Sequence, residues 1–413
     1  MQRVRLLLPY LREQGWKAEV LAVEPGQVAA PVDEWLSVGM PADVPVHRVA
    51  ALDLGWRWIP GLGTLTFRAL GALRRAGDAL LKTGRFDLVY FSTTQFGVHT
   101  LGPRWQGKFG VPFVMDYQDP WVNDYYREHP QAAPPGGRLK YAVVYRLNRC
   151  MEPRVLRHCA GITSVSSDYP RQLRRRYPFL RSDWPVEVLP FPGDDRDMRR
   201  VEEDGTRQSE FAPGNGHLHW VYVGRGGSDM HLALRGLFGA LREHEQNQSG
   251  LFNTLRLHFI GTSYAAAGRG RKTVEPLAAE YGLAATVREH PDRIPYSQAL
   301  RCLLDADALI VPGSDDPGYT ASKLYPYILA RKPLLAVFHE QSSLVDIVQK
   351  TRAGTVVPFS SGEATESIAQ RILATGWLQH PPAPATLWAE FEPHTARAMT
   401  RRLCLLFESC RKH

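Results

Sequence analysis

The sequence predicts an α/β protein with two doubly wound domains, each built on a parallel sheet. Short apolar runs alternate with longer amphipathic stretches along most of the 413 residues. Strands of a parallel sheet are buried on both faces, so they read as continuous apolar runs with the covering helices between them. A polar stretch at 192–217, PGDDRDMRRVEEDGTRQSEFAPGNGH, separates two halves of this kind.

The first half opens with a helical pattern where a strand is expected. RVRLLLPYLREQG has helical periodicity and ends at Gly15, which suits a C-cap. A doubly wound half normally opens with a strand and a glycine-bearing turn. We therefore expect that the first strand is missing through a late start of this sequence; an unusual fold that begins with a helix is the alternative.

The remaining elements of the first half follow in regular order. A helix is expected at 67–81, FRALGALRRAGDALL. The expected strands are AEVLAV (18–23), DLVYFS (87–92), PFVMDY (112–117), GITSVS (161–166) and EVLPF (187–191).

The second half repeats this alternation. A helix is expected at 296–307, YSQALRCLLDAD. The expected strands are HWVYVG (219–224), LRLHFIG (255–261), ALIVPG (308–313), PLLAVF (333–338) and TVVPF (355–359). We therefore predict a first domain at 1–195, a linker at 196–216, a second domain at 217–385, and a C-terminal helix at 386–413 that can pack back on the first domain.

Composition narrows the class of protein. With 50 Lys and Arg against 42 Asp and Glu, the net charge of +8 favours acidic partners such as nucleotides, anionic lipid or nucleic acid. The five cysteines are scattered without a C-x-x-C spacing, so neither a zinc site nor a disulfide framework is expected, and a reducing cytosol fits. No apolar run reaches the ~18 residues that predict a membrane-spanning helix.

Motifs in both halves resemble those of one family. YVGRGGSDMHLALRGLFGAL, LRLHFIGT, DRIPYSQALRCLLDADALIVPGS and SKLYPYILARKPLLAVF together resemble the nucleotide-sugar-binding domain of retaining glycosyltransferases of family 4. QGWKAEVLAV, RFDLVYFSTT, VPFVMDYQDPW and MEPRVLRHCAGITSVSSDYPRQL are similar to its acceptor-side domain. The resemblance implies the GT-B fold of two facing Rossmann-like domains. It also implies that the missing piece is the family's first strand and Gly-Gly loop.

Lys323 is the first candidate for binding the donor. A Gly/Pro-rich loop, PGSDDPGYTASK, follows the strand ALIV and contains Ser314, Thr320 and Ser322 before Lys323. Hydroxyl side chains can cap a helix there, and a lysine can meet phosphate as a point charge. The alternative is a surface lysine at the start of a helix.

Arg225 is the second donor-side candidate. It follows the strand HWVYV and is flanked by Gly224, Gly226 and Gly227, at the strand end where ligands approach α/β sheets. In the family, an Arg and a Lys in this region stabilise the leaving diphosphate. Arg225 matches the first, whereas the second falls near His231. A solvated loop charge is the alternative interpretation of Arg225.

The acidic pair of the family is absent. Its two glutamates are separated by seven residues, and the corresponding positions here are Gly318 and Pro326. The second glutamate usually holds the ribose, so nucleotide affinity or identity can differ in this chain. Asp315 and Asp316 are possible substitutes.

Polar residues after two strands of the first half suggest an acceptor site. VMDYQDPW places Asp116, Gln118, Asp119 and Trp121 just past a strand, where the family has a histidine or an acidic group near the reacting sugar. Asp119 is the candidate to orient the acceptor hydroxyl, whereas Asp116 can equally cap a turn. Thr93 and Thr94 suit hydroxyl recognition or turn capping.

The family resemblance leads to a functional prediction. We expect a retaining glycosyltransferase that uses a nucleotide-sugar donor, with Arg225, Lys323 and Asp119 as its catalytic residues and a glycan, lipid-linked or small-molecule acceptor. No metal or other cofactor is expected, because GT-B enzymes generally work without one. A GT-B-type nucleotide-sugar epimerase and an inactive pseudo-transferase that binds nucleotide sugar are the alternatives.

The arginine-rich stretch RQLRRRYPFLR at 171–181 bears on where the protein acts. It can contact anionic lipid or form an ordinary solvated helix face. The expected location is the cytoplasm, with the inner face of the membrane as a peripheral site. No aromatic platform or known module points to nucleic acid.

Overall fold

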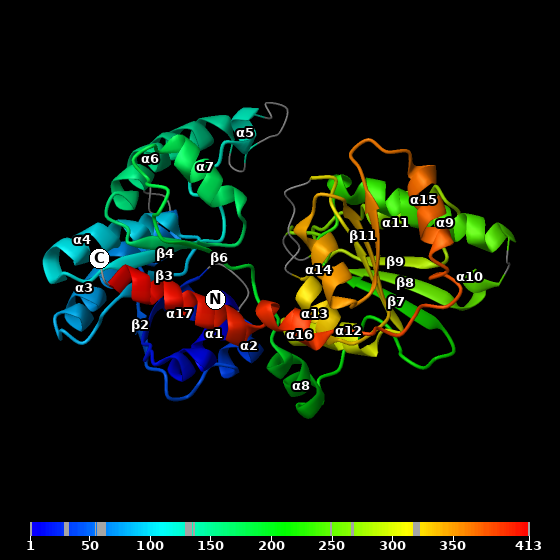
Figure 1. The fold of residues 1–413 in the computed structure, drawn as a ribbon, viewed down its shortest axis with the longest axis horizontal. Coiled ribbons are helices and arrows are strands. Elements are labelled where there is room, and N and C mark those ends of the chain that lie inside the picture. The colour runs from blue at the N-terminus through cyan, green and yellow to red at the C-terminus, as the bar shows by residue number, and fades with distance from the viewer. Residues whose placement is uncertain are drawn as a thin grey trace. The chain divides into compact units, whose positions relative to one another are not determined.

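The computed structural model describes residues 2–28, 33–53, 55, 63–128, 134, 137–247, 250–265, 268–316 and 323–411. The chain forms two compact units (Figure 1). The first consists of Met1–Phe191 together with Ala396–His413, and the second is Pro192–Thr395.

Parallel strands form the centre of the first unit. Strands β3 (Val89–Phe91), β4 (Phe113–Tyr117), β5 (Gly161–Ser164) and β6 (Val186–Val188) form a four-stranded sheet in that order. The pair β1 (Val20–Val23) and β2 (Val46–Val49) forms a separate parallel sheet. Side chains of both sheets pack in one hydrophobic core around Phe91, Trp105 and Phe113.

Helices of the first unit connect and cover these strands. They are α1 (Gln2–Leu11), α2 (Glu34–Val38), α3 (Leu65–Leu81), α4 (Leu101–Phe109), α5 (Tyr125–Glu128), α6 (Arg138–Leu156), α7 (Asp168–Arg176) and α17 (Ala396–Arg411). The predicted cap at Gly15 is confirmed: the residue ends the turn after α1 with φ of 79°. Among the described residues, the first strand comes only after this turn.

The last helix, α17, belongs to the first unit although it ends the chain. It packs against α1 and three strands of the sheet. Its Phe407 ring lies edge-on to Trp16 and Tyr90, with ring centroids 5.3 and 5.2 Å apart, and Arg402 pairs with Glu187 of β6.

The second unit is a doubly wound domain. Its six parallel strands lie in the order β12-β11-β10-β7-β8-β9, and helices lie on both faces of the sheet (Figure 1). The strands are β7 (Leu218–Val223), β8 (Leu255–Ile260), β9 (Val287–His290), β10 (Ala308–Pro312), β11 (Leu334–His339) and β12 (Thr355–Phe359). The order reverses between β7 and β10, and ligands of such sheets bind at the carboxyl ends of the strands beside this point.

The helices of the second unit complete the alternation. They are α8 (Asp195–Glu203), α9 (His231–Asn247), α10 (Leu251–Thr254), α11 (Val274–Ala279), α12 (Tyr296–Asp305), α13 (Leu324–Leu329), α14 (Ser343–Thr351), α15 (Thr365–Ala374) and α16 (Trp388–Phe391). Within the described ranges, no helix is both long and apolar enough to cross a membrane.

A linker was expected at 196–216. The first half of this segment lies mostly in helix α8. Asp194 caps this helix by accepting a hydrogen bond from the backbone N–H of Arg196. Met198 and Val201, three residues apart, are buried on the side that packs against α12 and α13. The burial of these two apolar side chains makes the segment part of the second unit.

Candidate active site

Lys323 lies beside the reversal point of the second sheet. It is the N-cap residue of α13, directly before Leu324. Its Nζ donates a hydrogen bond to the hydroxyl of Tyr222 at 2.9 Å and lies 5.0 Å from the centre of that ring. A Cβ atom on Gly224 would lie 2.3 Å from the same Nζ, so this lysine position requires a glycine at the end of β7.

The electrostatic surroundings of Lys323 disfavour its charged form. Burial of the ammonium group, followed by the nearby positive charges of Arg225 and Arg293, lowers the pKa of Lys323 to about 7. The negative charge of Asp229 opposes this shift. Three cations near one another are strained electrostatically unless an anion joins them.

Arg225 is held in a fixed orientation by Asp229. Its Nη1 and Nη2 donate to the two carboxylate oxygens of Asp229 at 2.8 and 2.5 Å. The Tyr222 hydroxyl donates to the backbone carbonyl of Arg225 at 2.7 Å, so Tyr222 contacts both Arg225 and Lys323. Although burial opposes it, hydrogen bonds from Arg225 and Ser314 lower the pKa of Asp229.

The loops after β7 and β10 meet at Asp229. Ser314 is buried, and the backbone N–H of Asp315 donates to the Asp229 carbonyl at 2.8 Å. Gly226 lies against Thr262 after β8, where its N–H donates to the Thr262 carbonyl at 2.8 Å. The structure thus brings Arg225, Ser314 and Lys323 into one region. Thr320, Ser322 and Gly318 lie outside the described residues.

Three residues of this region were not predicted from the sequence: Tyr222, Asp229 and Arg293. Arg293 follows β9, and its guanidinium lies 4.1 Å from the centre of the Tyr264 ring. Its position after a strand of the parallel sheet is the signal that could have found it. His231, at the start of α9, has a buried Nε2 with no hydrogen-bond partner among the described residues.

The predicted acceptor-side residues divide between the interior and the surface of the first unit. Asp116 is fully buried at the end of β4. One of its oxygens accepts from Arg3 Nε at 2.9 Å, Ser92 Oγ at 3.0 Å and Gln118 Nε2 at 2.7 Å, and the other accepts from Thr163 Oγ1 at 2.8 Å. Because both oxygens of Asp116 already accept hydrogen bonds from the protein, we interpret this carboxylate as structural.

The other acceptor-side candidates have different surroundings. Trp121 is buried and stacks on Phe96, with ring centroids 5.8 Å apart. Thr93 accepts a hydrogen bond from the backbone N–H of Gln95 at 3.0 Å, which fixes a turn. Thr94 and Asp119 are exposed, although partial desolvation raises the pKa of the Asp119 carboxyl. Asp119 is therefore accessible to a ligand from solvent.

Metal ligands do not gather in the part of the chain that the structure describes: no group of three or more His, Cys, Asp or Glu side chains is placed to hold an ion.

Comparison with known families finds a match in the first part of the chain. Residues 2–192 match a family described as a glycosyl transferase 4-like domain. A comparison with curated proteins finds no match for the chain.

Solved structures similar to this one cover nearly the whole chain. HepE of Anabaena, solved in complex with UDP and glucose, is 14% identical, with 97% of this chain and 93% of that chain covered and a TM-score of 0.57. A UDP-forming α,α-trehalose-phosphate synthase from Burkholderia xenovorans is 11% identical, with coverages of 95% and 99% and a TM-score of 0.54. Sucrose-phosphate synthase from Thermosynechococcus elongatus is 15% identical, with coverages of 95% and 98% and a TM-score of 0.53. These similarities confirm the predicted GT-B fold.

Proposed function

We propose that this glycosyltransferase moves a sugar from a nucleoside-diphosphate sugar to an acceptor with retention of the anomeric configuration. Its residues 2–192 match a glycosyl transferase 4-like domain, and its fold is GT-B. The observation that carries the proposal is the place of Lys323, which is hydrogen-bonded to Tyr222 of β7, is linked through that hydroxyl to the backbone of Arg225, and is acted on by the positive charges of Arg225 and Arg293. Asp229 balances only one of these three positive charges, and a diphosphate would supply further negative charge.

The chemistry that we assign to these cations is stabilisation of the leaving group. When the bond between the sugar and the diphosphate breaks, negative charge develops on the diphosphate oxygens. Arg225 and Lys323 are positioned beforehand by Asp229 and Tyr222, so little reorganisation is needed at that moment. In retaining transfer the leaving phosphate itself can take the acceptor's proton, and positioning then replaces a separate protein base.

The position of the family's second cation falls near His231. The buried Nε2 of His231, which has no partner among the described residues, is available to hydrogen-bond a donor oxygen. We assign it this role in place of the family's lysine.

The acceptor that we propose is a glycan, a lipid-linked sugar or a small molecule. Asp119 is the candidate to orient its hydroxyl, because it is exposed two residues after β4 while Asp116 is enclosed by Arg3, Ser92 and Thr163. We place the reaction in the cytoplasm, with the acceptor supplied from solution or from the membrane surface.

Titration calorimetry with a panel of nucleotide sugars tests the proposal. UDP-sugars are the first choice because two similar structures are described as a UDP complex and a UDP-forming synthase. Lys323→Ala and Arg225→Ala should each weaken binding, whereas Arg242→Ala, an exposed change on α9 of the same unit, should not. The proposed site is wrong if both site variants bind as the parent protein does.

Transfer and its stereochemistry need a second measurement. Release of nucleotide with acceptor present, followed by NMR of the product's anomeric proton, shows whether configuration is retained. An inverted product would contradict the retaining mechanism. Tight binding with no transfer to any acceptor would instead favour a nucleotide-sugar-binding protein, in which Pro326 stands where the family has its ribose-binding glutamate.

A further inference from the structure

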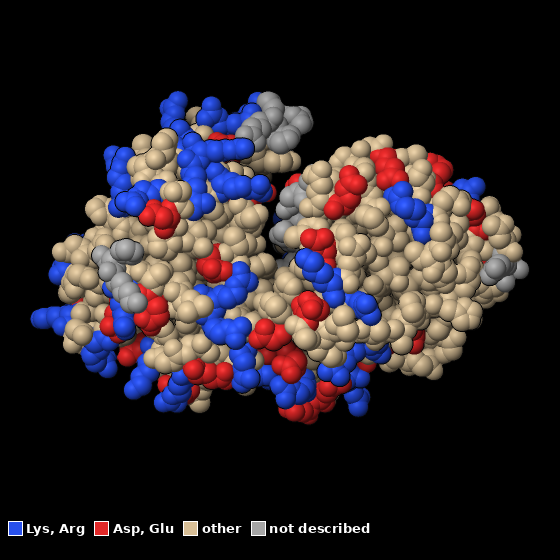
Figure 2. Space-filling model, in the orientation of Figure 1, with Lys and Arg blue, Asp and Glu red and all other residues tan. Residues whose placement is uncertain are grey.

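Helix α6 carries a concentration of positive charge on the first unit. Its exposed charged side chains are all basic: Arg138, Lys140, Arg146, Arg149 and Arg154. The only acidic residue of the helix, Glu152, is buried. Lys and Arg side chains gather over the end of the first unit that carries α6 and α7 (Figure 2). This surface complements a partner that is negatively charged.

The same helix also exposes large apolar side chains. Leu139, Val143 and Leu147 are 83%, 52% and 49% exposed. Their spacing of four residues places them in one line along the helix, which we call the apolar stripe. Single exposed apolar residues are ordinary on protein surfaces, but a line of them between basic residues is the pattern of a helix that lies in a membrane interface.

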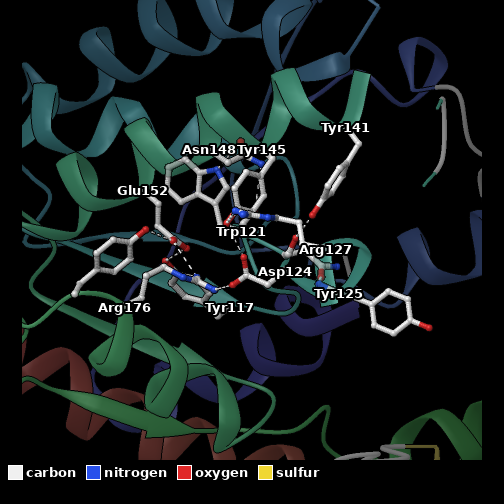
Figure 3. A network of polar contacts seen from close by, with 12 residues as sticks. Tyr117, Trp121, Asp124, Tyr125, Arg127, Tyr141, Tyr145, Asn148, Glu152 and Arg176 are labelled. Atoms are coloured by element: carbon white, nitrogen blue, oxygen red, sulfur yellow. Dashed lines mark hydrogen bonds and ion pairs between the residues drawn. The ribbon is translucent and has the colours of Figure 1, made fainter. Parts of the chain in front are cut away.

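The opposite side of α6 is fixed to the protein by polar contacts (Figure 3). Tyr141 donates to the Asn123 carbonyl at 2.7 Å, and Tyr145 donates to Asp124 at 2.6 Å. Asn148 Nδ2 donates to the Trp121 carbonyl at 3.1 Å. Because this side is held by specific hydrogen bonds, the helix cannot turn its apolar stripe inward without breaking them.

Glu152 completes this anchored side. It accepts hydrogen bonds from Tyr117 at 3.2 Å and Tyr177 at 2.7 Å, and it pairs with Arg176 of α7 at 3.5 Å. The inward residues at 141, 145, 148 and 152 are thus polar, whereas the outward residues at 139, 143 and 147 are apolar. Along residues 139–148 this arrangement is the reverse of an ordinary surface helix, whereas Val155 and Leu156 in the last turn are buried in the hydrophobic core.

We propose that the apolar stripe and the basic residues of α6 dock the first unit on an anionic lipid surface. Lipid headgroups supply negative charge, and the acyl layer beneath them takes up Leu139, Val143 and Leu147. Long Lys and Arg side chains can extend from the helix to the headgroups while their stems stay apolar. Tyr125 of α5, half exposed, provides a further residue of the kind found at membrane interfaces.

Flotation of the full-length protein with vesicles tests this docking surface. Vesicles of phosphatidylcholine mixed with phosphatidylglycerol should bind the protein, and added salt should weaken that binding. Vesicles of phosphatidylcholine alone should bind it far less. Absence of binding to the anionic vesicles, or equal binding to both kinds, overturns the proposal.

Two pairs of substitutions separate the apolar and the basic contributions. Leu139→Gln combined with Leu147→Gln should reduce binding about tenfold or more, because two buried side chains are lost from the acyl layer. Leu405→Gln, on α17 of the same unit and 66% exposed, is the matched control and should have no effect. Lys140→Glu with Arg146→Glu should also reduce binding, whereas Arg242→Glu on α9 should not.

The docking surface does not rest on the proposed transfer reaction. Nucleotide-sugar binding by the α6 variants should equal that of the parent protein, so the two proposals can fail separately. A dimer in light scattering that the Leu139→Gln, Leu147→Gln protein cannot form would show that a second copy covers the stripe, and would overturn the lipid assignment. RNA binding that depends on Lys140 and Arg146, without vesicle binding, would also overturn the lipid assignment.

Discussion

Lys323 donates a hydrogen bond to the hydroxyl of Tyr222, and the same hydroxyl donates to the backbone carbonyl of Arg225. One phenol therefore joins the two cations that we assign to the leaving diphosphate. It lies on β7, within the sheet, and α13 brings Lys323 to it from a position 101 residues further along the chain. Tyr222 is thus a positioning residue for both charges.

Tyr222→Phe should weaken nucleotide binding about tenfold, because a hydrogen bond to a charged group is lost while the ring stays in place. Titration calorimetry measures the change. In a Lys323→Met background the same substitution should have little further effect, since the ammonium that it positions is gone. Equal effects in both backgrounds would show that Tyr222 acts independently of Lys323.

Protonation of Lys323 should be linked to nucleotide binding. Its pKa is lowered to about 7 in the free protein, and a diphosphate beside it raises that value again. Above about pH 7, binding should therefore take up a proton, and affinity should fall as pH rises further. Calorimetry in buffers of different ionisation enthalpy measures this uptake, which Lys323→Met should abolish. Proton release on binding would contradict the assignment.

The same lowered pKa affects stability. The unfolded chain keeps its lysine protonated up to the ordinary pKa near 10.5, whereas the folded free protein loses the proton near 7. This group therefore makes unfolding easier at neutral pH, and its unfavourable contribution disappears as pH rises from 7 towards 10.5. A functional charge is maintained here at some expense of stability.

The strands that are apolar runs could be predicted from the sequence, including the edge strands β3 and β12, whereas β2 and β9 could not. β10 and β11 are buried along their whole length and read as apolar runs. β2 (VHRV) and β9 (VREH) were missed because each alternates between more and less exposed residues and contains charged side chains. Both lie at the edge of their sheets, where one side has no neighbouring strand.

Only part of the candidate site could be predicted from the sequence. Arg225 and Lys323 follow recognisable strands and glycine-rich turns. Arg293 follows β9, so missing the strand also hid the residue. Tyr222 reads as an ordinary core residue of β7, and nothing in the sequence reveals its hydroxyl contacts. Arg3, the partner of Asp116, lies 113 positions away in the sequence. It belongs to the first helix, whose position in the fold could not be predicted from the sequence.

Breaking the ion pair between Arg3 and Asp116 should destabilise the first unit strongly. Both side chains are fully buried, so Arg3→Met leaves a carboxylate without its cation, at a cost of about 3–5 kcal/mol. Urea denaturation measures the change, and adding Asp116→Asn should recover part of it. Arg12→Met is the matched control, because its pair with Asp43 is largely exposed and should contribute less than about 1 kcal/mol.

His99 should make the first unit sensitive to acid. Its ring is fully buried among Phe91, Phe96 and Trp121, and neither nitrogen has a partner among the described residues. Burial lowers the pKa of His99 to about 3, so the unfolded chain binds a proton more readily than the folded protein below its ordinary pKa of 6.5. Stability should therefore fall as pH drops from 6.5 towards 3.

His99→Leu tests this directly. The substitution removes two unsatisfied polar atoms, so it should raise the free energy of unfolding at neutral pH by about 1–2 kcal/mol. The gain should grow as pH falls below 6.5, because the leucine protein has no group at this position to protonate. Urea denaturation at several pH values measures both effects. A loss of stability at neutral pH, constant across the acidic range, would show that the imidazole has a favourable contact in the folded protein.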